Sequence, residues 1–212
     1  MTVRKIRMGL VGGGEGAFIG AVHRMAAALD GQIELVCAAL SSDPERAARS
    51  AQALYLPATR SYADYRSMMR AERALPAEIR MDFVAIATPN HLHLPVALAA
   101  IEQGFHVLSD KPATLNLDEC KQLRAALQAS PVLYGLTHTY TGYPLVREAQ
   151  FRIANGELGA IRKVVVDYAQ VWLSAAVEQT DNKQAQWRLD PKRAGSGGCI
   201  GDIGVHAANL VE

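Results

Sequence analysis

The 212-residue chain is predicted to be an α/β protein that begins with a doubly wound parallel sheet. Two observations lead to this prediction. Short apolar runs of strand type alternate with amphipathic or well-capped helical stretches, and the first apolar run enters a cluster of glycines. Strands that alternate with helices in this way form a parallel sheet that is covered on both faces.

The expected strands of this first part are short and apolar: "IRMGLVGGG", "IELVCAAL", "MDFVAIAT", "FHVLSD" and "VLYGLTH". Helices are expected between them, over Phe18–Leu29, "SDPERAARSAQAL", "YADYRSMMRAERA", Leu94–Ile101 and "NLDECKQLRAALQA". The second of these helices has a Ser/Asp cap with Pro44 in its first turn, and Gly104 ends the fourth.

The alternation of short strands with helices ends near Thr137, so we predict one domain over residues 1–137 and another over 138–212. A helix from about Pro144 ends before Gly156, and "AIRKVVVDYAQVWL" is predicted to be the longest strand. A glycine-rich loop and a last helix follow. One strand cannot form a stable sheet alone. We therefore expect the start of an α+β substrate and oligomerisation domain that is truncated in this chain.

The composition excludes several classes of protein. The formal net charge is +1 with acidic and basic residues interspersed, which argues against a nucleic-acid partner. No apolar run approaches the ~20 residues of a membrane span, and we recognise no signal peptide. Three cysteines lack metal-ligand spacing and suit a reducing compartment, as small core or site-lining residues. We expect a cytoplasmic protein with no metal site and no membrane partner.

The stretch "GLVGGGEGAFIGAVHR" has the pattern of a Rossmann-type phosphate-binding turn. Glycines allow backbone N–H groups to approach a pyrophosphate, and the following helix adds positive potential at its N-terminus. Gly12, Gly14 and Ala17 fit G-x-G-x-x-[GA], and Gly20 takes the packing role of the third glycine across a longer turn. The alternative is a tight strand-to-helix turn without a ligand. The predicted dinucleotide contacts here are Gly12, Gly14, Gly16, Ala17, Phe18 and Ile19.

The end of the second strand bears on the choice of cofactor. NAD-preferring sites usually carry an acid there, which binds the ribose 2′-hydroxyl. This chain has Ser41 and Ser42 at that place and Arg46 downstream, a group that permits a 2′-phosphate. Asp43 could instead bind the ribose or merely cap the helix. On these residues we expect NADP(H) to bind at least comparably to NAD(H).

Two further stretches, "ATPNHLHLP" and "SDKPA", follow strands at the carboxyl edge of the sheet, where open α/β sheets bind ligands. Six residues besides Lys111 are therefore predicted to line the nicotinamide side of the crevice: Thr88, Pro89, Asn90, His93, Asp110 and Pro112. A lone lysine before a proline is usually a surface charge in a turn. Here Lys111 is predicted to lie beside the other crevice-lining residues, which favours a role in the site.

Together, "GLVGGG", "ATPNHLH", "SDKPA", "GELGAIRKV" and "WRLDPKRAGSGGCIGDIGVHAANL" resemble the Gfo/Idh/MocA family of oxidoreductases over essentially the whole chain. The resemblance implies a nicotinamide-dependent enzyme acting on a sugar, cyclitol or polyol. Lys111 matches the lysine of the family's Glu-Lys-Pro motif, with Asp110 in place of the glutamate. Asp202 and His206 match the acid and histidine of its D-x-x-x-H helix.

The implied roles agree with the chemistry of carbinol oxidation. His206 suits the general base because imidazole titrates near neutral pH. Lys111 would stabilise the developing alkoxide or take part in the proton relay. Asp202, four residues before His206, would hold the substrate hydroxyl and orient the imidazole. The alternative for this pair is an exposed helical i,i+4 contact, worth about 0.3 kcal/mol.

Two departures from the family pattern are visible. The glycine turn is longer than usual, and "THTYTGYP" stands where many members carry Arg-Phe, which places Tyr140 or Thr141 at the arginine's position. The expected substrate contacts are Tyr140, Trp187 and Arg188. The full-length family members imply a homo-oligomer. A nucleotide-binding sensor without turnover is the alternative function, although such a protein need not keep Lys111, Asp202 and His206 together.

Overall fold

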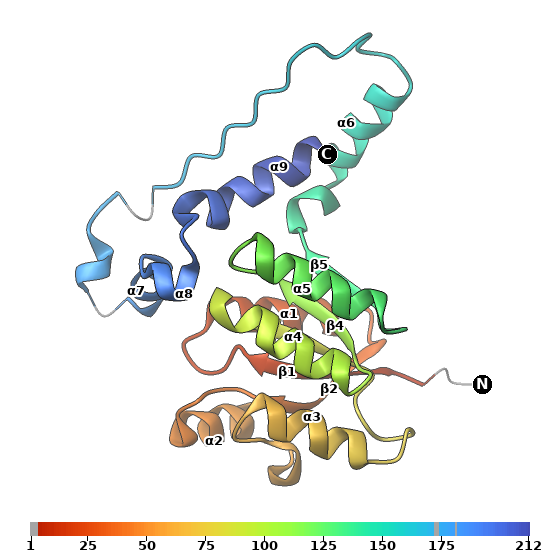
Figure 1. Ribbon diagram of the computed structural model, residues 1–212, viewed down its shortest axis with the longest axis vertical. Coiled ribbons are helices and arrows are strands. Elements are labelled where there is room, and N and C mark those ends of the chain that lie inside the picture. The colour runs from red at the N-terminus through yellow and green to blue at the C-terminus, as the bar shows by residue number, and fades with distance from the viewer. Residues whose placement is uncertain (1–3, 172–173, 181) are drawn as a thin grey trace. The chain divides into compact units, whose positions relative to one another are not determined.

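The computed structural model describes residues 4–171, 174–180 and 182–212, and the chain divides into two compact units (Figure 1). The first unit ends at Leu136 and the second begins at Thr137. Among the described residues, no helix is both long enough and apolar enough to cross a membrane.

The first unit is a five-stranded sheet in the order β2-β1-β3-β4-β5. Strands β1 to β4 pair in parallel, as predicted. The strands are β1 (Ile6–Gly12), β2 (Ile33–Ala39), β3 (Phe83–Ala87), β4 (His106–Asp110) and β5 (Tyr134–Thr137). The helices are α1 (Phe18–Ala28), α2 (Pro44–Ala53), α3 (Tyr65–Ala74), α4 (His93–Glu102) and α5 (Leu117–Gln128), with short 3₁₀ turns η1 (Ala58–Arg60) and η2 (Asn90–Leu92).

Helices cover both faces of this sheet. The evidence is that alternate residues of the strands belong to two separate apolar clusters, each of which also contains helix side chains. On β3, Val84 and Ile86 belong to the cluster that contains side chains of α3, α4 and α5. Ala85 and Ala87 belong to the other cluster, with Ala27 of α1 and side chains of α2. Successive strand residues point to opposite faces, so the near-continuous apolar runs buried on both sides confirm the doubly wound α/β prediction.

Capping side chains set where several helices begin. Asp43, Asp64 and Asn116 are the N-caps of α2, α3 and α5, and each accepts a hydrogen bond from a backbone N–H of the first turn. The bond from the Arg46 N–H to Asp43 is 2.8 Å long, and it lowers the pKa of the Asp43 carboxyl. Of the two roles left open for Asp43, the structure shows the cap.

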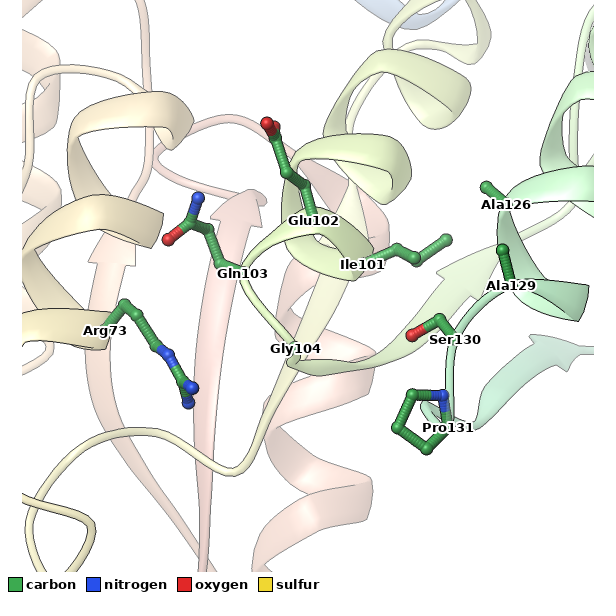
Figure 2. Close-up of a pocket in the computed structure, with 9 residues that line it drawn as sticks. All are labelled: Arg73, Ile101, Glu102, Gln103, Gly104, Ala126, Ala129, Ser130 and Pro131. Atoms are coloured by element: carbon green, nitrogen blue, oxygen red, sulfur yellow. The ribbon is translucent and has the colours of Figure 1, made fainter.

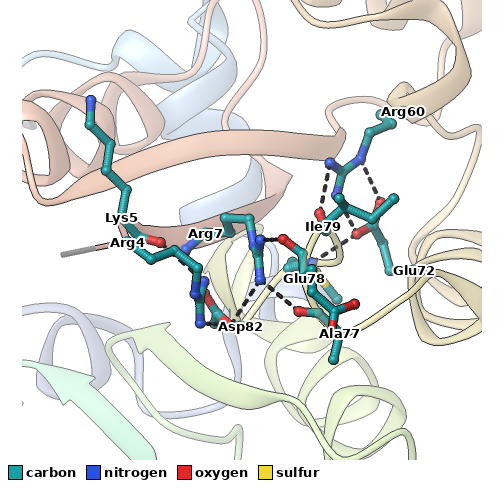
Figure 3. A network of polar contacts seen from close by, with 10 residues as sticks. Arg4, Lys5, Arg7, Arg60, Glu72, Ala77, Glu78, Ile79 and Asp82 are labelled. Atoms are coloured by element: carbon teal, nitrogen blue, oxygen red, sulfur yellow. Dashed lines mark hydrogen bonds and ion pairs between the residues drawn. The ribbon is translucent and has the colours of Figure 1, made fainter. Parts of the chain in front are cut away.

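One carboxylate is fully buried in the first unit. Glu72 accepts hydrogen bonds from Arg60 Nε at 3.0 Å and Nη2 at 2.5 Å, from the Tyr62 hydroxyl at 3.0 Å and from the Met81 N–H at 2.9 Å. Figure 3 shows Arg60 reaching Glu72 beside a second, more exposed pair of Arg4 and Asp82. These donors satisfy a charge that would otherwise be costly to bury.

The second unit is built from short helical elements. They are η3 (Thr139–Gly142), α6 (Pro144–Ala154), η4 (Val177–Gln179), α7 (Lys183–Arg188), α8 (Pro191–Ala194), the π-helical turn η5 (Ile200–Gly204) and α9 (Val205–Val211). Helix α6 matches the predicted helix and is followed by Gly156 with a φ of +75°.

The long strand predicted from residue 160 onward is not formed. Residues 160–171 have no strand assignment, and Trp172 and Leu173 lie outside the described residues. Large apolar side chains in this part, including Val165 and Val171, are exposed. A strand needs a hydrogen-bonded neighbour, and the described residues supply none here. The predicted strand is therefore absent from residues 160–171, and this agrees with the expectation that the chain lacks partners for it.

The cysteines differ from one another. Cys37 is buried against α3 residues, and its burial raises the pKa of the thiol. Cys120 and Cys199 are exposed, so the expectation of core or site-lining cysteines is wrong for Cys120, which lies on the solvent-facing side of α5.

Candidate functional site: a dinucleotide turn and an acid-histidine segment

The glycine turn between β1 and α1 is packed so tightly that side chains are excluded. Gly12 and Gly13 have φ values of +77° and +71°. A Cβ on Gly12 would lie 2.6 Å from the carbonyl oxygen of Ala87 on β3. A Cβ on Gly20, in the first turn of α1, would lie 2.3 Å from the Cα of Gly13. Gly20 therefore has the helix-packing role predicted for the third glycine.

The rest of the turn is open to a ligand. Gly16 has a φ of +78° and no atom within 4 Å of an added Cβ. Ala17 is the N-cap of α1, where no side chain caps the helix. Phe18 is exposed, while Ile19 packs against the apolar cluster beneath α1. An uncapped helix N-terminus behind close-packed glycines fits a bound pyrophosphate.

We expect Gly20→Ala to weaken dinucleotide binding and to lower the free energy of unfolding by about 1–3 kcal/mol, because its Cβ meets backbone rather than a movable side chain. Gly142→Ala is the matched control, since no atom lies within 4 Å of its added Cβ. Urea unfolding and a fluorescence titration with NADH measure both effects. Equal behaviour of the two variants would contradict the packing role.

The carboxyl ends of β3 and β4 are joined by one histidine. Thr88 and Pro89 follow β3, and the buried Asn90 begins η2. Asp110 is the last residue of β4, and Lys111 and Pro112 follow it. His93 Nδ1 lies 2.6 Å from the carbonyl oxygen of Pro112, and its Nε2 lies 3.0 Å from that of Thr88. Its side chain is only 1% exposed. His93 thus braces the two loops from inside, which differs from the predicted role as a residue lining the crevice.

His93 predicts a pH dependence of stability. Burial is the main cause that lowers the pKa of its imidazole, against the two carbonyl contacts that raise it. The unfolded chain therefore binds a proton that the folded chain does not, and the free energy of unfolding falls as pH drops below about 6.5. We expect His93→Gln to flatten this slope between about pH 7 and pH 5 in urea unfolding. His23, whose pKa burial also lowers, leaves a residual slope.

A slope in the His93→Gln variant as steep as in the parent protein would assign the pH dependence to other groups. The carboxylates with lowered pKa values, such as Asp64, do not interfere, because they titrate below this window.

Two buried polar atoms in the described segment that follows β3, the Thr88 hydroxyl and His91 Nδ1, have no hydrogen-bond partner. An unsatisfied buried hydroxyl is costly unless a ligand or water completes it. Thr88 lies where a dinucleotide fold places the nicotinamide half of its cofactor, so the chain fits such a ligand at this point too.

In the second unit, His206 is buried in an aromatic cluster. Its ring centroid lies 4.6 Å from that of Tyr140 and 5.9 Å from that of His138, both edge to face. The Tyr140 hydroxyl lies 2.6 Å from the hydroxyl of Tyr168. This hydrogen bond is the main cause that raises the pKa of Tyr140 to about 12, so the phenol stays protonated near neutral pH.

Asp202 and His206 do not lie on one regular α-helix. Asp202 is in the π-helical turn η5, and His206 is in the first turn of α9. The Asp202 carboxylate lies 3.4 Å from Arg188 Nε on α7. The Arg188 guanidinium lies 4.4 Å from the ring centroid of Trp187. The predicted substrate residues Trp187 and Arg188 therefore associate with Asp202, while Tyr140 associates with His206.

The predicted site residues thus form two groups. The glycine turn, the ends of β3 and β4, and Lys111 belong to the first unit, and Asp202, His206 and the substrate residues belong to the second. That Lys111 meets His206 in one active site stays a prediction. Two residues of the aromatic cluster around His206, namely His138 and Tyr168, were not predicted from the sequence. The strand-like alternation of side chains around Tyr168 was the signal that could have indicated it.

An open hollow of about 430 Å³ lies elsewhere in the first unit (Figure 2). Gly104 and Pro131, which line it, precede β4 and β5, so the hollow is at the amino edge of the sheet. Arg73 and Glu102 are its charged lining residues. It is at the edge opposite the glycine turn and is not the candidate site.

Known proteins share both parts of this chain. Residues 6–138 match the family described as "Oxidoreductase family, NAD-binding Rossmann fold", and residues 146–212 match the "GFO/IDH/MocA C-terminal domain". An inositol dehydrogenase homologue from Azotobacter vinelandii, solved with NAD+, is 38% identical with a TM-score of 0.94 over 99% of this chain and 53% of its own.

Among curated relatives, levoglucosan dehydrogenase from Pseudarthrobacter phenanthrenivorans is 29% identical over 99% of this chain and 51% of its own length. An uncharacterised oxidoreductase of Bacillus subtilis is also 29% identical, over 96% of this chain and 51% of its own. The chain therefore spans about half the length of the curated relatives it matches. With both parts of the sequence matched in order, the chain belongs to the Gfo/Idh/MocA family of oxidoreductases.

Proposed function

We propose that the protein is an NAD(P)-dependent oxidoreductase that transfers a hydride between nicotinamide and a carbinol carbon of a sugar, cyclitol or related polyol. The observation that carries this proposal is the glycine turn, in which Gly13 and Gly20 pack backbone to backbone below an uncapped helix N-terminus. Related structures hold NADH with myo-inositol and NADH with levoglucosan.

A bound nicotinamide supplies the hydride acceptor in the oxidising direction. His206 takes the proton from the substrate hydroxyl, and the ammonium of Lys111 stabilises negative charge that develops on the same oxygen. Asp202 accepts a hydrogen bond from a neighbouring hydroxyl of the substrate and is itself oriented by Arg188. The aromatic rings around His206 exclude water from the imidazole, which favours proton transfer to a defined partner.

The second unit also supports a polyol as substrate. It combines the flat apolar faces of Tyr140 and Trp187 with charged groups, Arg188 and Asp202, that can bind several hydroxyls. Such a mixture suits a small ligand with alternating C–H and O–H groups. The homo-oligomer that the family resemblance implies stays a prediction.

The test is an absorbance assay of nicotinamide reduction with the natural gene product that contains this chain. A panel of inositols, anhydrosugars and aldoses is offered with NAD+ and with NADP+. Reduction with at least one polyol is the expected result. Tight binding of NADH without turnover on any member of the panel would support the non-catalytic sensor and overturn the proposed enzyme.

A further inference from the structure

The tip of the glycine turn is joined to helix α2 by a buried serine. Ser50, 4% exposed, accepts a hydrogen bond from the Glu15 N–H at 2.9 Å and donates one to the Arg46 carbonyl at 2.7 Å. A Cβ on Gly14 would lie 2.9 Å from the Ser50 hydroxyl and 2.9 Å from the Leu40 carbonyl oxygen. The turn is therefore held directly against the end of β2 and the helix that follows.

An ion pair closes the same junction on its outer side. The Glu15 carboxylate, from the turn, lies 3.0 Å from Arg49 Nε on α2, and both side chains are more than half exposed. Arg49 also lies 3.9 Å from Glu45, which is 90% exposed on its own helix. Two carboxylates thus compete for one arginine, and only Glu15 comes from the turn.

This position is where the two kinds of nicotinamide cofactor differ. In dinucleotide-binding folds the pyrophosphate lies over the glycine turn, and the adenosine ribose lies at the end of the second strand. The ion pair joins the turn to α2, the helix that follows the second strand, and Gly14 of the same turn lies against Leu40 at the end of that strand. We infer from this placement that the pair borders the ribose 2′ position. Asp43, the nearest acid after β2, uses its carboxylate to cap α2.

We propose that Glu15 replaces the acid missing from the end of β2 and selects NAD(H) over NADP(H). Its carboxylate repels a 2′-phosphate and at the same time occupies Arg49, which would otherwise attract one. Ser41, Ser42 and Arg46 alone predict at least equal binding of NADP(H), and the charge in the turn reverses that expectation. The proposal rests on the dinucleotide binding of the proposed function.

Dissociation constants of NADH and NADPH test it, measured by fluorescence titration of the intact protein at low ionic strength. We expect Glu15→Gln to improve the affinity for NADPH relative to NADH by about ten-fold or more. Glu45→Gln is the matched control, because it removes the same charge from the same arginine without touching the turn. Glu45→Gln should change the ratio of the NADPH and NADH dissociation constants by no more than about two- to three-fold.

Arg49→Ala should change the relative affinity in the opposite direction. It leaves the Glu15 charge unopposed, so binding of NADPH should weaken relative to binding of NADH. An unchanged ratio in Glu15→Gln, or an equal change in Glu45→Gln, would overturn the proposal while the parent protein still binds NADH. Failure of the parent protein to bind either cofactor would instead overturn the proposed function. All three side chains are solvent-exposed, so folding is expected to survive each change.

Discussion

Lys111→Ala and His206→Ala are each expected to lower the turnover of the natural gene product by about 10²–10⁴-fold, the usual contribution of a general acid or base. The affinity for NADH should stay within a few-fold, because the glycine turn is expected to carry most of the dinucleotide contact. Steady-state kinetics on the best polyol and a separate NADH titration measure the two quantities.

Lys121→Ala is the matched control for the lysine. Lys121 is exposed on α5 and pairs with Asp118 at 3.2 Å, so its loss should leave turnover unchanged. For His206, the pH profile of kcat/KM adds a second readout, since removing the base should abolish the acidic limb. Near-normal turnover in either alanine variant would show that the assigned proton chemistry is wrong.

The first unit could be predicted from the sequence because each of its strands carries its own local signals. "MDFVAIAT", for example, is a continuous apolar run, and both faces of β3 are indeed buried under helices. Asp43 and Pro44 mark the start of α2 at the positions that caps and first-turn prolines prefer. Such features depend on neighbouring residues alone, so no knowledge of the whole fold was needed.

The second unit could be predicted less well, because its conformation depends on distant partners. Residues 160–171 have a strand pattern, but a pattern cannot supply the neighbouring strand that would pair with them. The segment around Asp202 is another case. Gly201 and Gly204 flank its centre, and these weak helix formers accompany a π-helical turn where a regular α-helix was expected.

For the candidate site, the sequence indicated which residues belong to it better than it indicated which neighbours each of them contacts. Gly20 has the packing role that its spacing suggested, whereas His93 proved to be buried between two carbonyl oxygens. The sequence shows Glu15 among glycines, yet nothing local to it indicates that Arg49 and Ser50 are its partners. Those contacts arise only when the turn packs against α2.

The largest loss of stability is expected from Arg60→Met. This change removes two of the donors to Glu72, whose carboxylate is fully buried, and leaves only the Tyr62 hydroxyl and the Met81 N–H. Breaking a buried ion pair from one side typically costs about 3–5 kcal/mol, a large part of the roughly 5–15 kcal/mol that holds a domain folded. Urea unfolding monitored by circular dichroism measures the change.

Arg4→Met is the matched control, since it breaks an arginine–carboxylate pair of similar length in the same region (Figure 3). Arg4 is largely exposed, and Asp82 keeps its 2.8 Å hydrogen bond from the Arg7 N–H, so the unfolding midpoint should hardly move. The double variant Arg60→Met/Glu72→Leu should recover much of the loss, because it removes the unpaired buried charge together with its partner. If the single and double variants were equally unstable, lost packing rather than the uncompensated carboxylate would be the cause.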